Sequence, residues 1–190
     1  DPELFVDILS HVYRGKNVPL EEAVTEKDKT RANISFKLLM KFKTVPGING
    51  MNVEFDVLTN WVSQARNLAT NKDLLEVCDN HIGQLLAHSP LDPEENFWPP
   101  SAVCNVIEGI SSDDLEQGFR IECFNKRGVY GKAINEGGDQ ERDLAEKYQR
   151  WADNTLSFPR TSAALASIAE EWRLLAANED IRAEQGKLKG

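Results

Sequence analysis

Apolar residues recur every three or four positions along most of the chain, the spacing that buries one face of an α-helix. The first such stretch covers about 2–14 and follows Asp1, a favourable N-cap residue. Its expected buried face consists of Leu4, Phe5, Ile8, Leu9 and Val12. A second helix is predicted over about 26–43, behind the imperfect capping pair Thr25 and Asp28. Its expected core residues are Ala32, Phe36, Leu39, Met40 and Phe42.

The helical pattern resumes after a segment at 44–52, which contains one proline and two glycines and is predicted to be a loop. Further helices are expected over about 53–69, from 71 or 73 to about 88, over about 100–109, 112–126 and 139–156, and from about 159 onward. Their predicted buried faces include Phe55, Ile121, Leu156 and Leu175.

No stretch alternates β-branched and polar residues, so the pattern predicts no sheet of consequence. We expect an all-α fold, an irregular bundle or short solenoid-like array of about seven to eight helices in antiparallel hairpins. Prolines at 90, 93, 99 and 100 predict an extended connector. Residues 1–190 should therefore form a single helical domain, or two subdomains at 1–89 and 100–190 joined by the connector 90–100.

The composition indicates a globular chain with no membrane association. Apolar residues make up 41% and charged residues 28% of the sequence, which differs from the composition of disordered chains. No apolar run is long enough to span a bilayer, and no signal peptide is visible. The formal net charge of −9 disfavours nucleic acids and anionic membranes as partners of the whole protein, while a local basic patch is compatible with it.

The three cysteines, Cys78, Cys104 and Cys123, are odd in number and stand among apolar neighbours. This pattern is typical of buried free thiols in a reducing compartment. We therefore expect a cytoplasmic protein without disulfides, in which Cys78 and Cys123 are inert core residues.

His81 is the histidine with the most interesting neighbours, because Cys78 precedes it by three residues and would share its helical face. The further Cys or His ligands of a zinc site are missing, as are the common signatures of nucleophiles, phosphate loops and dinucleotide sites. We therefore expect no metal and no cofactor, and a structural role for His81. A polar site that combines His81 with Glu76, Asp79 and Arg120 is the alternative.

One loop differs from its surroundings because it gathers basic residues with glycine and an aromatic side chain. It contains Lys126, Arg127, Tyr130 and Lys132. Such a loop could donate hydrogen bonds to a carboxylate or phosphate. Basic residues followed by a glycine, here Gly128, also mark the C-terminus of a helix. The sequence leaves both interpretations open.

Trp98 is the one tryptophan that lies outside the predicted helix faces, within the proline-rich connector. An aromatic side chain in such a place either pins the connector onto the helices or is offered to a partner. Pinning is the interpretation we favour, and partner binding is the alternative.

Three segments carry a resemblance to a group of proteins: DPELF at 1–5, HIGQLLAHSPLDP at 81–93 and GFRIECFNKRGV at 118–129. They resemble the C-terminal helical region of large multidomain bacterial proteins of uncharacterised activity. The resemblance implies an excised helical domain, which the start of the chain at Asp1 without an initiator methionine also suggests. It implies no catalytic residues.

Two functions are compatible with these features. The preferred hypothesis is a non-enzymatic interaction or scaffolding module of a larger bacterial intracellular protein, which binds a protein partner or other domains of its parent chain. The alternative is a helical enzyme or small-ligand domain with a polar site between helices around His81 and the loop 126–132. A groove or shallow concave face would favour the first, and a deep pocket with converging polar groups the second.

Overall fold

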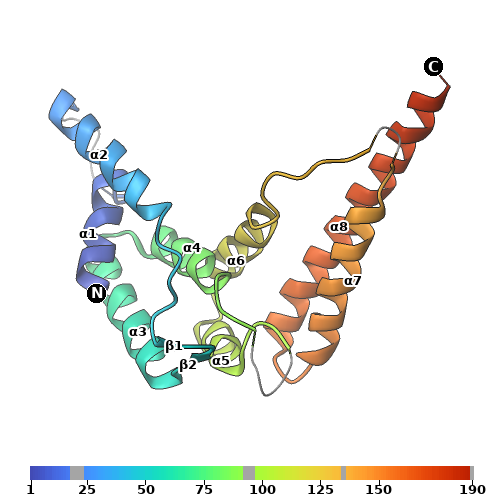
Figure 1. The fold of residues 1–190 in the computed structure, drawn as a ribbon. Coiled ribbons are helices and arrows are strands. Elements are labelled where there is room, and N and C mark those ends of the chain that lie inside the picture. Colours follow the sequence, from blue (N-terminus) through green and yellow to red (C-terminus); the bar gives the residue numbers. More distant parts are fainter. Residues whose placement is uncertain (18–23, 92–96, 134–135, 189–190) are drawn as a thin grey trace. The chain divides into compact units, whose positions relative to one another are not determined.

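The computed structural model describes residues 1–17, 24–91, 97–133 and 136–188. Within these ranges it confirms the all-α prediction, with eight helices and one short hairpin (Figure 1). The chain divides into two compact units, Asp1–Phe119 and Arg120–Gly190. The division falls inside a helix, α6 (Asp113–Asn125), and not at the proline-rich connector, of which residues 92–96 lie outside the described ranges. None of the described helices has the length and apolar character needed to cross a bilayer.

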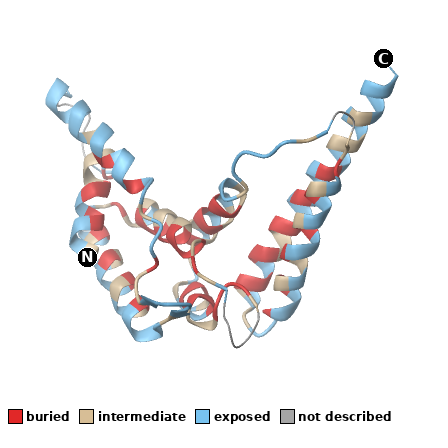
Figure 2. Ribbon diagram, in the orientation of Figure 1, coloured by how far each residue is buried: buried red, intermediate tan, exposed pale blue. Residues whose placement is uncertain are grey.

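The first unit contains five complete helices and the beginning of α6. The five are α1 (Pro2–Val12), α2 (Glu26–Leu39), α3 (Phe55–Asn71), α4 (Leu75–Leu86) and α5 (Ser101–Ile110). Helix α1 packs against α2, α3 and α4, and α3 packs against α4 and α5. The core lies along these contacts and includes Phe5, Leu9, Leu58, Ile82 and Ile107, all nearly inaccessible to solvent (Figure 2).

The first two helices begin where their capping residues predict. The Asp1 carboxylate accepts hydrogen bonds from the backbone N–H groups of Glu3 and Leu4, at 2.8 and 3.2 Å. Thr25 and Asp28 form a reciprocal capping box at the start of α2. Each cap satisfies backbone donors that a helix leaves unpaired in its first turn.

The segment 44–52, predicted to be a loop, instead leads into a small antiparallel hairpin. Strand β1 (Ile48–Asn49) pairs with β2 (Asn52–Val53), and Gly50 and Met51 form the turn between them. Gly50 has a φ of +63°, a left-handed conformation that glycine adopts without steric cost. Strands of two residues are too short to show the alternating pattern by which sequence predicts a strand.

Helices α4 and α6 approach each other at two glycines. A Cβ atom at Gly83 would lie 1.9 Å from the Leu115 carbonyl oxygen, and one at Gly118 would lie 1.9 Å from the Asn80 carbonyl oxygen. Real Cβ atoms are excluded at such distances, so both positions require glycine for this close backbone contact.

Several residues assigned to the core by their spacing are exposed. In α2 the buried residues are Ser35 and Leu39, whereas Phe36 and Met40 are about half exposed. The face of α2 that meets α1 is therefore rotated relative to the predicted one. The other expected core residues found exposed are Leu4, Phe55, Ile121, Leu156 and Leu175.

The second unit is built on a helical hairpin. Helix α7 (Asp139–Asn154) packs along α8 (Pro159–Lys187), and the end of α6 completes the unit. Its core includes Ala145, Tyr148, Leu165, Ile168 and Trp172. The Tyr148 hydroxyl donates a hydrogen bond to the Cys123 carbonyl across 3.3 Å, which joins α7 to α6.

Candidate functional site

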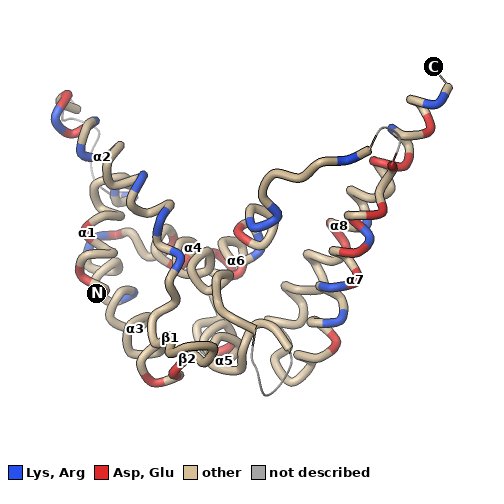
Figure 3. Tube along the Cα trace, in the orientation of Figure 1, with Lys and Arg blue, Asp and Glu red and all other residues tan. Residues whose placement is uncertain are grey.

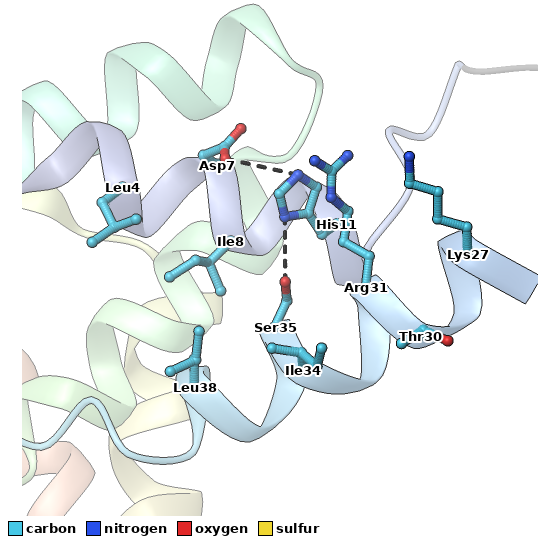
Figure 4. A pocket seen from close by; sticks show the side chains of 10 residues that line it. All are labelled: Leu4, Asp7, Ile8, His11, Lys27, Thr30, Arg31, Ile34, Ser35 and Leu38. Carbon is cyan, nitrogen blue, oxygen red and sulfur yellow. Dashed lines mark hydrogen bonds and ion pairs between the residues drawn. The ribbon is translucent and has the colours of Figure 1, made fainter.

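A groove of about 530 Å³ lies between α1 and α2 in the first unit. Leu4, Ile8 and Leu38 lie together at one end, Lys27 marks the other, and Arg31 lies between them (Figure 4). The complete lining is Leu4, Asp7, Ile8, His11, Lys27, Thr30, Arg31, Ile34, Ser35 and Leu38. The groove therefore has an apolar end and a cationic end.

The groove exists because α2 packs against α1 with only a narrow face. Ser35 is the polar residue of that face, and its Oγ lies 3.2 Å from His11 Nδ1, a hydrogen bond between the two helices. Ile34 and Leu38, one turn apart on α2, border this face and are 56% and 45% exposed. Across the groove, Leu4 of α1 is 53% exposed. Three large aliphatic side chains thus border one hollow and keep about half of their surface in water.

The charge around the groove opposes that of the chain. Between Glu26 and Lys43 the sequence holds six basic and two acidic residues, in a protein whose net charge is −9 (Figure 3). The two acids are engaged locally: Glu26 pairs with Lys29 at 2.7 Å, and Asp28 accepts a hydrogen bond from the Thr25 hydroxyl at 2.6 Å. Two of the basic residues, Lys27 and Arg31, line the groove (Figure 4).

Asp7 is the single carboxylate among the lining residues. It lies 3.5 Å from Lys72 Nζ and 3.7 Å from His11 Nε2. His11 of α1 and Lys72, which follows α3, therefore lie beside this carboxylate, and Lys27 and Arg31 keep the net charge of the lining positive.

Sequence reasoning did not single out this groove, although one signal for it was present. The basic residues of 26–43 form a local patch that is hidden in the net charge of the whole chain. A separate charge count for each predicted helix finds that patch. The apolar part does not follow from the sequence pattern, because Leu4 has core spacing and because Ile34 and Leu38 lie outside the stripe predicted for 26–43.

His81 lies within the first unit, against α1. Its Nε2 is 3.0 Å from the Tyr13 hydroxyl, and burial lowers the pKa of the imidazole. Asp79 is occupied by Arg66, which donates two hydrogen bonds to it at 2.8 and 3.2 Å. Burial, followed by the nearby Asp79 charge, raises the pKa of the Cys78 thiol to about 12. A protonated thiol is a poor nucleophile and a poor metal ligand.

All three cysteines are free and buried, as the sequence predicts. Among the described residues no three His, Cys, Asp or Glu side chains are placed to hold a metal ion. Residues Asp79 and His81 belong to the first unit, whereas Arg120 and the loop 126–132 belong to the second.

The basic loop surrounds a buried carboxylate in the second unit. Glu141 of α7 is 1% exposed, and its two oxygens lie 2.6 Å from Arg127 Nη1 and 2.6 Å from Lys132 Nζ. Lys132 also pairs with Glu179 of α8 at 3.2 Å. Burial alone would raise the pKa of Glu141, but the hydrogen bonds from Lys132 and Arg127 outweigh it and lower that pKa.

The remaining residues of the loop have different surroundings. The Arg127 guanidinium lies 3.4 Å from the centre of the Tyr130 ring, a cation–π contact. Lys126 follows the last residue of α6 and is exposed. Gly128 has a φ of +66°, as expected of a glycine that ends a helix. These contacts favour the structural interpretation for Arg127 and Lys132.

Trp98 is buried within the first unit. Its indole N–H donates a hydrogen bond to the Ser89 carbonyl across 3.0 Å, and its ring stacks on Phe119 with the ring centres 5.2 Å apart. Both contacts favour the pinning interpretation, because they fix the end of the connector against α6.

Comparison of the sequence with protein-family models finds no match, and neither does comparison with curated proteins or with solved structures.

Proposed function

We propose that this chain is a helical interaction module and that it binds a protein partner through the groove between α1 and α2. The observation that carries the proposal is the exposure of aliphatic side chains around one hollow. Leu4, Ile34 and Leu38 border it and are each about half exposed. Exposed apolar surface that is gathered in one place and rimmed by polar groups marks protein interaction sites in soluble proteins.

The chemistry of the groove supports binding and not catalysis. Its polar side chains are Asp7, His11, Thr30, Arg31 and Ser35, together with Lys27. Asp7 and His11 are engaged with neighbouring side chains, the His11 ring with the Ser35 hydroxyl, and Lys27 and Arg31 supply positive charge. An aliphatic floor with a few orienting polar groups is typical of a recognition surface.

A photo-crosslinking experiment tests the proposal. A photoreactive amino acid is placed at Ile34 in one sample and at Leu156, an equally apolar but more exposed residue of the second unit, in another. We expect a discrete adduct from position 34 in cells and none from position 156. The adduct identifies the partner, which is then purified for direct binding measurements.

Direct binding decides the outcome. We expect Ile34→Asp with Leu38→Asp to weaken binding of the purified partner about a hundredfold, because the double variant loses two aliphatic side chains at the centre of the interface with the partner. Leu156→Asp serves as the matched control and should leave the affinity within about twofold. Equal adducts at both positions, or full affinity in the double variant, would contradict the proposal.

A further inference from the structure

The polarity of the groove specifies the chemistry of what it binds. Its apolar end is formed by Leu4, Ile8 and Leu38, and its cationic end by Lys27 and Arg31 (Figure 4). A partner that satisfies both ends presents aliphatic side chains to one and carboxylates to the other. Opposite charges at the contact add to the specificity of such a pairing.

The walls of the groove favour a helix over an extended segment. Ile34 and Leu38 stand one turn apart on α2, and Leu4 and Ile8 stand one turn apart on α1. Two such rows of side chains form the ridges between which a third helix packs. An extended peptide gains its affinity from backbone hydrogen bonds to a sheet edge, and the groove is lined by helix side chains instead.

The length of the groove sets the length of the partner helix. On α2 the lining runs from Lys27 to Leu38, which at 1.5 Å per residue spans roughly 16 Å. A helix of about three turns covers that distance and places two or three apolar side chains on one face.

We propose that the groove binds an acidic amphipathic helix of about three turns. Its apolar face covers Leu4, Ile8 and Leu38, and carboxylates near one end pair with Lys27 and Arg31. This inference rests on the proposed function, because it names the partner of the same groove.

An anionic membrane surface shares part of this chemistry but fits less well. A bilayer offers a flat surface to exposed side chains, whereas Ile8 lies buried on the floor of the groove. The net charge of −9 also opposes the approach of the whole chain to anionic lipids. A short helix instead fits between the two walls, and its few carboxylates face the local cations Lys27 and Arg31.

A displayed peptide library provides the test. The library fixes leucine at helical spacing in peptides of about 14 residues and randomises the other positions, and it is selected on the full chain. We expect the selected sequences to be enriched in Asp and Glu towards one end. Enrichment of Lys and Arg, or no enrichment of any sequence, overturns the inference.

Charge reversal then locates the contact. We expect a selected synthetic peptide to lose at least tenfold in affinity for the Lys27→Glu, Arg31→Glu variant. A peptide with lysines in place of its acids should recover affinity for that variant. The matched control is Lys37→Glu with Lys41→Glu, two basic residues of the same patch outside the groove lining, which should change affinity less than about twofold. Equal losses in the two variants overturn the inference.

Two further arms separate the possible failures. If selected peptides are uncharged and still lose binding to Ile34→Asp, Leu38→Asp, the inference fails while the proposed groove stands. If peptides bind that variant as well as wild type, both the inference and the proposed groove fail.

Sedimentation with vesicles containing about one third phosphatidylserine tests whether the groove binds a membrane instead. Vesicle binding that is abolished by Lys27→Glu, Arg31→Glu would overturn the proposed helical partner in favour of an anionic lipid surface. Thermal melts confirm that each variant is folded.

Discussion

Lys132 and Glu141 are joined by a hydrogen bond of 2.6 Å that ties the loop after α6 to the buried side of α7. Arg127 holds the second oxygen of the same carboxylate. Removing the negative charge by Glu141→Gln leaves two cations without their shared partner. We expect the free energy of unfolding to fall by about 3 kcal/mol. Urea denaturation near neutral pH measures it, with the exposed Glu146→Gln of the same helix as a control that should change stability by less than about 0.5 kcal/mol.

The stabilisation from Glu141 should depend on pH in a defined direction. Its pKa in the folded protein is lowered from the ordinary value of 4.5. Its contribution is therefore complete above about pH 4.5 and is lost as the pH falls through the lower folded value. The stability difference between wild type and Glu141→Gln should shrink as the pH falls from about 4.5 to about 3. A difference that stays constant over this range would show that the charge of Glu141 contributes nothing.

The contact between α4 and α6 should tolerate no side chain at its glycines. We expect Gly83→Ala and Gly118→Ala each to cost about 1–3 kcal/mol or more, because the added Cβ forces the two backbones apart. Gly109 of α5 is the matched control: a Cβ there meets nothing within 4 Å, and Gly109→Ala should stabilise the protein by about 0.4–1 kcal/mol. Thermal unfolding followed by circular dichroism measures all three. Equal effects at Gly83 and Gly109 would contradict the close packing.

The cysteines should react slowly in the native protein. Burial is the largest cause that raises the pKa of Cys78 and Cys123 from 9.0 to about 12, which lowers their thiolate fraction about a thousandfold. Cys104 is also buried. We expect a chromogenic disulfide reagent at about pH 8 to label less than one thiol per native chain within minutes and three after denaturation. Rapid native labelling of Cys78 would restore it as a candidate nucleophile.

The helices follow from the sequence because their signals are local. Thr25 and Asp28 form the predicted capping box, and Gly128 has its left-handed conformation in the turn after α6, which ends at Asn125. Which face of a helix is buried depends instead on the neighbouring helix. Phe36 and Met40 have the right spacing for a core stripe, but α1 covers Ser35 and Leu39. When a helix has apolar residues on more than one face, their spacing alone does not show which face is buried.

The candidate site was harder to predict than the fold, for two physical reasons. The groove joins Leu4 with Leu38, residues from different helices whose approach no spacing rule predicts. Arg127 and Lys132 stand out in the sequence as a basic loop, but their partner Glu141 is one acidic residue among many until the fold buries it. Sequence thus identified the charge and missed its counterion.

The attachment of α2 to its unit mainly through α1 has a consequence for local opening. Only Ser35 and Leu39 of its 14 residues are buried, so releasing α2 exposes little apolar surface. Its amide protons should therefore exchange with solvent through a low-energy opening, well before those of α3 and α4 exchange through global unfolding. Since α2 forms one wall of the groove, a partner bound there can contact the chain fully only while α2 is in place. Binding therefore reduces the population in which α2 is released, and occupancy of the groove can be followed as slowed amide exchange along α2.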